Sequence, residues 1–442
     1  MPTSFRPYAP DQDLLLQPRL QEWLPEGHLS YFINDVIEEL DLRAFYKRYE
    51  GDGRRKSPYE PRMMLKVLIY AYASGVFSSR KIAKKLEEDV AFRVLAADNF
   101  PQHRTLCDFR KRHLSDFKAV FVQVIQIAQQ AELISLGTVA IDGTKVRANA
   151  NKHKAMSYQR LQAEELKLAE EIGALCDQAR STDAEEDRLY GVDHRGDELP
   201  EELHHRQARL KTIRDAKARL EQAQREADTA RGRHEDDDRR PPGGRGGPYK
   251  RDFGMPEDKA QSNFTDPDSS IMKTADGFQQ CYNGQLAVDR DFQLIVESKL
   301  TANSSDNGEL LPVLAGVEDN LEKRPETVLA DAGYQGEKCF IELEHRHIDS
   351  YIALKRKQKE LDEIDAKRYP ATRRMAEKLA SADGKAMYAE RKWVSEAVNG
   401  WIKQVLGFRQ FSVRGLKCAS GEWDLVCLAT NLRRLQRLIV LQ

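Results

Sequence analysis

The spacing of hydrophobic residues changes along the chain from helical to strand-like, and this change divides the sequence into regions. Residues 1 to about 135 have helical spacing; their run PRMMLKVLIYAYASGV is apolar on every side, which is typical of a helix buried in a small bundle. From about residue 260, short apolar runs alternate with helical segments, as in an α/β fold. We predict one mixed sheet built from the strand-like runs at 138–142, 281–288, 292–300, 327–331 and 349–354.

An insertion interrupts this α/β pattern after its first strand. Apolar residues recur over 156–228 at spacings of 3 and 4 in two segments, which predicts an antiparallel helical hairpin. Glu165 is the one polar defect in the first seam. Residues 233–252 are rich in Gly, Pro and charge, and they predict a flexible linker. The seam residues are Tyr158, Leu161, Leu168, Ile172 and Leu175, followed by Leu203, Leu210, Ile213, Leu220 and Ala227.

Composition limits the class of protein. The chain has 442 residues, of which 40% are hydrophobic and 32% charged, enough for more than one globular domain. Its six cysteines include no CxxC pair and no metal-ligand spacing, so we expect reduced thiols. The first residues lack the apolar core of a signal peptide, and no apolar run reaches the length of a membrane span. These features predict a soluble intracellular protein.

Charge changes the interpretation of the N-terminal helices. The net charge of the whole chain is −1, so no global field draws it to an anionic partner. Residues 51–118, however, carry 15 Lys and Arg against 8 Asp and Glu. A short helix, a break and then a helix with Arg110, Lys111 and Arg112 in its early turns are compatible with helix-turn-helix DNA binding. A plain helical bundle with a solvated basic face is equally compatible with these residues.

Two predicted strands end on an aspartate that precedes a tight, glycine-containing segment. The stretches are TVAIDGTKV, with Asp142, and VLADAGYQG, with Asp331. Loops at the carboxyl ends of sheet strands are where open α/β folds bind ligands, and Gly143 and Gly333 would let the backbone turn. Each aspartate alone is adequately explained as a turn residue or helix cap. The pair in one sheet favours a site for a hard cation such as Mg²⁺, which prefers oxygen ligands.

A third carboxylate comes from the predicted helix 385–408. Val394, Val398, Ile402 and Val405 form its apolar stripe, which should face the core. A second stripe contains Tyr388, Lys392, Glu396, Asn399 and Lys403. Glu396 would therefore project beside lysines and a tyrosine. It belongs either to a solvated network of Glu–Lys pairs or to a metal site, with Arg391 and Lys403 contacting DNA phosphates.

The three acids, taken in order, resemble the DDE transposases of bacterial insertion sequences, most closely those of insertion-sequence family 1182. The similarity rests on AIDGTKVRANANKHK, on TDPDSSIMKT at 265–274 and on the GYQGEK residues after Asp331. It also rests on the signature Tyr388, Arg391, Glu396 and Lys403. Two departures stand out. Four residues separate Arg391 from Glu396 where the family has three, and Ala397 and Asn399 replace a proline and a phenylalanine.

The resemblance implies an α/β protein whose mixed sheet is RNase H-like, with an N-terminal all-helical DNA-binding domain and an inserted helical hairpin. The implied boundaries are 1–135 for the DNA-binding domain, 136–155 plus 260–435 for the catalytic domain, 156–232 for the hairpin and 233–259 for the linker.

The resemblance also implies the chemistry. Asp142, Asp331 and Glu396 would be catalytic and would hold two Mg²⁺ ions, for which Mn²⁺ can substitute, about 4 Å apart. Double-stranded DNA, as terminal inverted repeats and target, would be the partner of a homodimer or larger assembly in the cytoplasm at the nucleoid. Arg110, Lys111, Arg112, Tyr388, Arg391 and Lys403 would contact this DNA. Two alternatives remain open: a catalytically decayed copy that only binds DNA or dimerises, and a metal nuclease without strand joining.

Overall fold

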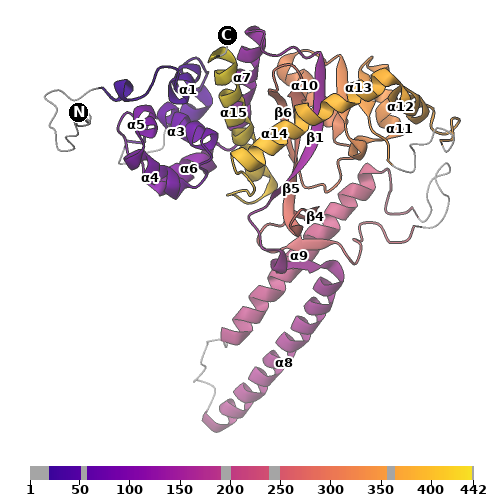
Figure 1. Ribbon diagram of the computed structural model, residues 1–442. Helices are drawn as coiled ribbons and strands as arrows, with labels where there is room; N and C mark the ends of the chain where they lie inside the picture. The colour runs from indigo at the N-terminus through magenta and orange to yellow at the C-terminus, as the bar shows by residue number, and fades with distance from the viewer. Residues whose placement is uncertain (1–18, 51–56, 191–200, 238–248, 356–363, 441–442) are drawn as a thin grey trace, which may run out of the picture.

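The computed structural model describes residues 19–50, 57–190, 201–237, 249–355 and 364–440. Its N-terminal part is helical and packs around α3, which is buried along nearly its whole length (Figure 1). Glu60 caps α3 by accepting a hydrogen bond from the Met63 amide, and Pro61 opens the first turn, where its missing N–H is not needed. After the 3₁₀ turn Leu20–Trp23, the helices are α1 Leu29–Glu38, α2 Arg43–Lys47, α3 Pro61–Ala73, α4 Ser79–Glu88, α5 Val90–Ala96, α6 His103–His113 and α7 Phe117–Gln130.

One mixed sheet forms the centre of the molecule, as predicted from the five apolar runs. Strand β5 lies antiparallel to β1 on one edge and to β6 on the other, and β7 and β8 extend the sheet in parallel beyond β1. A further strand, β4, which the apolar pattern does not predict, pairs with the start of β5. The strands are β1 Thr138–Arg147, β4 Ser270–Thr274, β5 Gly277–Asp289, β6 Ile295–Thr301, β7 Thr327–Ala330 and β8 Asp349–Ile352.

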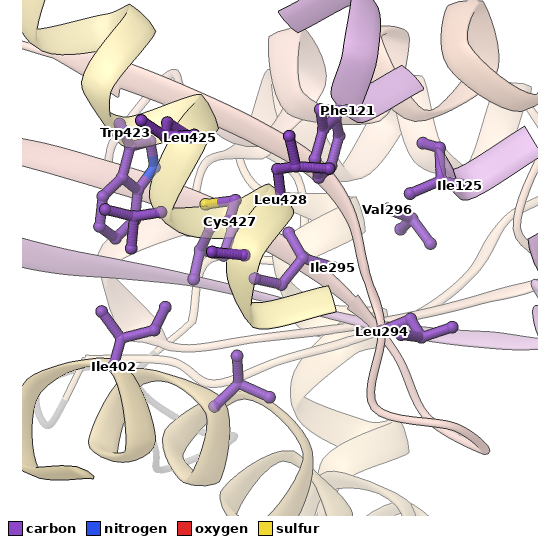
Figure 2. Packing of buried hydrophobic residues seen from close by; sticks show 14 of the residues in the cluster. Phe121, Ile125, Leu294, Ile295, Val296, Ile402, Trp423, Leu425, Cys427 and Leu428 are labelled. Atoms are coloured by element: carbon purple, nitrogen blue, oxygen red, sulfur yellow. The ribbon is translucent and has the colours of Figure 1, made fainter. Parts of the chain in front are cut away.

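Helix α15 (Leu416–Val440) joins the N-terminal helices to the sheet. Its Leu425 and Leu428 are fully buried, and Figure 2 shows this helix between Phe121 of α7 and Ile402. A Cβ atom at Gly284 of β5 would lie 2.7 Å from the ring of the buried Trp423. Glycine is therefore required there for α15 to lie this close to the sheet. The α/β part also contains α10 Leu310–Leu321, α11 Glu337–His345, α12 Pro370–Ala380 and α13 Ala382–Arg391.

Two long helices, α8 (Tyr158–Tyr190) and α9 (Glu201–Ala230), form a hairpin that projects away from the sheet (Figure 1). The short strands β2 (Ala155–Ser157) and β3 (Gln261–Asn263) pair at its base. The polar defect Glu165 accepts hydrogen bonds of 2.9 Å from Arg214 and Lys217 of the facing helix, so it forms an ion pair across the seam. The buried seam residues include Leu161, Leu168, Leu210, Ile213 and Ala216.

The predicted linker is only partly described. Residues 238–248 lie outside the described ranges, as do residues 1–18 of the N-terminal region and 191–200 of the hairpin. Beside the gap, the Arg233 guanidinium lies 3.9 Å from the centre of the Tyr249 ring. Among the helices within the described ranges, none has an apolar stretch of the length needed to cross a membrane.

Candidate active site

Asp142 and Asp331 lie side by side on neighbouring parallel strands. In the β1–β7 pairing, Ile141 is opposite Ala330, so the two aspartates are the next positions in register. Asp331 follows the end of β7 and opens the 3₁₀ turn Ala332–Tyr334, where its Oδ1 accepts a 2.7 Å hydrogen bond from the Gly333 amide. Asp331 is therefore a turn cap as well as a neighbour of Asp142.

Asp142 differs from the prediction because it does not end its strand. Strand β1 continues to Arg147, since residues 143–147 still pair with residues 281–285 of β5. Gly143 is also not a turn residue. A Cβ atom there would lie 2.3 Å from Asp306 Oδ1 and 2.7 Å from Gln285 Nε2, so this glycine is needed for close packing.

The Asp142 carboxylate is largely buried, with a side-chain exposure of 14%. Burial raises its pKa to about 6; the Arg391 guanidinium opposes this shift and the negative charge of Asp331 adds to it. Asp142 accepts hydrogen bonds from the Asn399 side-chain amide at 3.1 Å and from the Gly143 amide at 3.0 Å. The carboxylate is thus held in place, in the electrostatic field of a second carboxylate.

Asp306 is a further acid of this region, and no sequence motif indicated that it would lie here. Its Oδ1 accepts hydrogen bonds from Asn283 Nδ2 at 2.8 Å and from Gln285 Nε2 at 2.7 Å. Successive side chains of a strand point to opposite faces, so the face of Gly143 that approaches Asp306 is opposite to the face on which the Asp142 side chain lies. A Cβ atom at Gly333 would lie 2.9 Å from Asp331 Oδ1 and 3.0 Å from Asp306 Oδ2, so Asp306 lies beside the turn that follows Asp331. Asp306 follows a polar loop with no apolar run, so its sequence context marks it as nothing more than a loop residue.

Tyr334 lies near Asp306, Asp142 and Asp331, whose charges act on it. Its hydroxyl donates to Gln285 Oε1, and its side chain is fully buried. Burial raises the pKa of Tyr334 far above its usual value, and the negative charges of Asp306, Asp142 and Asp331 raise it further. Tyr334 is consequently a neutral hydrogen-bond donor, and it forms part of the wall behind the aspartates.

Glu396 lies in an irregular helix that crosses the sheet near Asp142. After α13, the backbone forms the π-helical turn Lys392–Glu396, the short α-helix α14 (Ala397–Gly400) and a second π turn, Trp401–Val405. A π turn bonds each residue to the fifth one after it and accommodates one extra residue per turn. Val394, Val398 and Ile402 are buried as predicted, whereas Val405 is 62% exposed.

Arg391 bridges the two predicted acids of this region. Its Nη2 donates to Glu396 Oε1 at 2.7 Å, and its Nη1 lies 3.7 Å from Asp142 Oδ1. The Arg391 side chain is 12% exposed, whereas that of Glu396 is 49% exposed. Arg391 therefore links Glu396 to Asp142, and the Glu396 side chain retains access to solvent.

The two other predicted DNA contacts on this helix also lie near the aspartates. The Tyr388 ring is 5.8 Å from the Arg391 guanidinium, and its side chain is half-buried. Burial lowers the pKa of the half-buried Lys403 amine, and the Asp142 charge opposes that shift. Arg391 therefore contacts Asp142 directly, Tyr388 lies against Arg391, and the charge of Asp142 acts on Lys403.

The three basic residues of α6 have different environments. They lie in the last turn of α6 and not in early turns, because the helix ends at His113. Arg110 is 4% exposed; its Nη1 donates to the Tyr72 hydroxyl and to the Phe77 carbonyl, both at 2.9 Å. This interior position leaves it no surface for DNA. Lys111 is exposed, and the Arg112 guanidinium lies 5.0 Å from the centre of the Tyr49 ring.

The donor atoms around Asp142 and Asp331 suit a hard cation, but they do not form a complete metal site. Within the described ranges, no three His, Cys, Asp or Glu side chains are grouped as metal ligands. The buried Asn399 Oδ1 and Asn283 Oδ1 atoms have no hydrogen-bond partner among these residues. Carboxylate and amide oxygens are the ligand types that Mg²⁺ and Mn²⁺ accept.

Two protein-family models match the chain. The model described as a transposase domain (DUF772) matches residues 18–112, which comprise most of the N-terminal helices. The model described as a transposase DDE domain matches residues 255–432, which include Asp331 and Glu396. Asp142 lies between the two matches.

No curated protein and no solved structure matches the chain. The two family matches do not resolve the narrower resemblance to insertion-sequence family 1182. The mixed α/β fold is consistent with a DDE transposase, a family of polynucleotidyl transferases that generally use divalent metals. Together, the two matches support an insertion-sequence transposase.

Proposed function

We propose that this protein cuts and joins the ends of an insertion sequence by metal-dependent phosphoryl transfer, with Asp142, Asp331 and Glu396 as its catalytic carboxylates. The observation that carries the proposal is the register of β1 and β7, which puts Asp142 beside Asp331 under a helix that bears Glu396. This arrangement occurs in a chain that matches two transposase domains. The alternative of a decayed copy is not favoured by those matches.

The order of strands supports an RNase H-like catalytic domain. An antiparallel β5 lies between β6 and β1, and the parallel strands β7 and β8 follow on the other side of β1. We assign 136–155 and 260–435 to this domain, 156–232 to the inserted hairpin and 1–135 to a DNA-binding domain. Joining two transposon ends requires two active sites, so the proposal includes a homodimer or a larger assembly.

Asp142, Asp331 and Glu396 would hold the divalent cations. Bound Mg²⁺ or Mn²⁺ supplies an activated attacking oxygen and charge stabilisation of the leaving oxygen. The residues of the chain supply the position and charge of the site. Asn399 orients the Asp142 carboxylate, and the Gly333 amide orients the Asp331 carboxylate. Arg391 lies close to both Asp142 and Glu396 and neutralises their charges. The exposed half of Glu396 gives its carboxylate the freedom to leave Arg391 for a cation.

DNA would reach this site from the side of the irregular helix. Tyr388 and Lys403 flank Arg391 there, and phosphate contacts of this kind position a duplex without reading its sequence. Lys111 and Arg112 remain candidates for contacts by the N-terminal helices. Arg110 is not among the proposed DNA contacts, because its guanidinium donates hydrogen bonds to groups inside the protein.

Amide substitutions of the three acids test the proposal. Asp142→Asn, Asp331→Asn and Glu396→Gln preserve side-chain shape but remove the charge that a divalent cation needs. Cleavage and joining of the cloned ends of the element should each fall by about three orders of magnitude or more. Binding of the same DNA in EDTA should remain near the wild-type level.

Glu390→Gln is the matched control, because Glu390 is on the same helix and pairs with Arg290 instead. This control should retain both cleavage and joining. The proposal fails if Asp142→Asn cleaves at close to the wild-type rate, in which case Asp142 has a structural role only. Cleavage without joining by the wild-type protein would identify a nuclease.

A further inference from the structure

A pocket of about 230 Å³ lies next to the irregular helix, away from Asp142. Arg433, Arg434 and Arg437 of α15 line it together with Trp401 and Gln293. Helix α14 separates this pocket from the acids, because Ala397 and Val398 line the pocket while Asn399 of the same helix donates to Asp142.

Among the residues that the structure describes, no carboxylate neutralises the three arginines of this pocket. No ion pair involves Arg433, Arg434 or Arg437 within the described part of the chain. Burial lowers the pKa of Arg433 and of Arg434, and the positive charge of Arg437 lowers both further. Arrangements of like charges without a counter-charge destabilise a folded protein, so an anionic partner is the expected complement.

The guanidinium groups of Arg433 and Arg434 are held by hydrogen bonds, and most of their N–H donors are unused. Arg433 Nη1 donates to the Ala73 carbonyl at 2.7 Å, and Arg434 Nε donates to the Phe292 carbonyl at 2.8 Å. The Arg433 guanidinium also lies 5.5 Å from the centre of the Trp401 ring. A guanidinium has five N–H donors, so each group keeps donors for a ligand after these contacts. A preorganised pair of planar donors fits the oxygens of a phosphate group.

We propose that the Arg433–Arg434–Arg437 pocket binds a backbone phosphate of the DNA on which the protein acts. This inference rests on the proposed function and adds a phosphate-binding site on the other side of α14 from the acids. The pocket lies where α15 meets the N-terminal helices, since Arg433 bonds to Ala73 of α3 and Gln436 bonds to Gly27. A duplex that contacts both the N-terminal helices and the irregular helix would pass this position, so the pocket would fix its path toward Asp142.

DNA binding in EDTA by the full-length protein tests the site separately from catalysis. The probe is a short fluorescein-labelled duplex of mixed sequence, titrated at several salt concentrations. Arg437→Gln is the cleanest variant, because Arg437 is exposed and has no hydrogen bond to the rest of the described chain. It should weaken binding about fivefold to tenfold and reduce the slope of log K against log salt by about one. Arg434→Gln with Arg437→Gln should reduce the slope by about two.

Arg324→Gln is the matched control, since it removes an arginine that is already paired with Glu318. The inference is overturned if Arg437→Gln and the double variant bind DNA with the affinity and salt slope of this control. A thermal-shift titration with inorganic phosphate identifies the source of the anion. Stabilisation by phosphate that the double variant loses, together with unchanged DNA binding, would assign the pocket to a small phosphorylated ligand and would also overturn the inference.

Failure of the proposed function would leave a different signature. Near-wild-type cleavage by Asp142→Asn would refute the catalytic assignment, while the salt slopes measured in EDTA would still report on the pocket. Conversely, an unchanged slope in variants of the pocket would remove the phosphate site and leave the assignment of the acids intact.

Discussion

Asp424 shows how one buried carboxylate makes stability depend on pH. It lies on α15 with 7% exposure, and its Oδ1 accepts a 2.7 Å hydrogen bond from the Ser298 hydroxyl of β6. Burial raises the pKa of Asp424 to about 6, although the Lys118 charge opposes the shift. An acid whose pKa is higher in the folded than in the unfolded protein lowers stability progressively as pH rises from the unfolded pKa to the folded pKa, and the loss is complete above the folded value. Asp424 should therefore be neutral at pH 4 and unfavourable at pH 8.

Asp424→Asn removes this ionisation and keeps an oxygen that can accept from Ser298. At pH 8 the variant should be more stable than the wild type by about 1–3 kcal/mol, because a shift of two pKa units corresponds to roughly 3 kcal/mol at most. At pH 4 the two proteins should have similar stability. Urea unfolding at both pH values measures the difference. Asp319→Asn, at an exposed position of α10, should show no such dependence; equal effects of the two substitutions would contradict the assignment to Asp424.

At the scale of elements, the position of α15 depends on a close approach at Gly421. A Cβ atom there would lie 2.1 Å from the carbonyl oxygen of Leu114, in the turn between α6 and α7. The contact is between two backbone segments, so no flexible side chain can move aside to make room. The helix can therefore pack against the N-terminal helices only where it has no side chain.

Gly421→Ala should destabilise the protein by about 1–3 kcal/mol, because overpacking moves α15 away from its neighbours. The free energy of unfolding in urea gives the measurement. Gly173→Ala is the control: Gly173 is exposed in α8, and a Cβ atom added there would meet nothing within 4 Å beyond its own helical turn. Alanine at that position should stabilise by about 0.5–1 kcal/mol through helix propensity. An unchanged free energy of unfolding for Gly421→Ala would show that α15 can shift without loss of stability.

At the scale of the whole molecule, a buried polar network joins the N-terminal helices to the α/β part. Glu422 of α15 is fully buried and accepts hydrogen bonds from the Tyr72 hydroxyl at 2.6 Å and from the Ser412 amide at 2.7 Å. The Arg110 guanidinium lies 3.7 Å from the same carboxylate. These contacts span α3, α6 and the segment before α15, so the two matched regions should unfold together.

Glu422→Gln should lower stability by about 3–5 kcal/mol, because it leaves the buried Arg110 charge without its counter-charge. Thermal unfolding followed by near- and far-ultraviolet circular dichroism should remain a single transition at a lower temperature. Arg110→Met combined with Glu422→Leu removes both charges and should recover a large part of the loss. Two separate transitions in the wild type would show that the N-terminal helices and the sheet are not coupled through this network.

The sequence alone determined the features that depend on local pattern. Short apolar runs predicted the strands of the mixed sheet, and apolar spacings of 3 and 4 predicted the seam of the hairpin, because the helical spacing follows from backbone geometry. That Asp142 and Asp331 belong to one sheet followed from two similar strand-and-acid segments, whereas the pairing of β1 with β7, which makes them neighbours, is a feature of the tertiary structure. The boundaries were less accurate: β1 extends five residues past Asp142 because β5 continues to pair with it.

Only the tertiary structure decided which charged residues are exposed to solvent and which are paired with other residues of the protein. Arg110 has the sequence context of a surface cation beside Lys111, yet its partners Tyr72 and Glu422 are far away in sequence. The bonds of Asn399 to Asp142 and of Asp306 to Gln285 are equally non-local, as is the gathering of Trp401 with the arginines of α15. Burial and pairing of a charge depend on the elements that pack around it, and hydrophobic periodicity within one element carries no information about those neighbours.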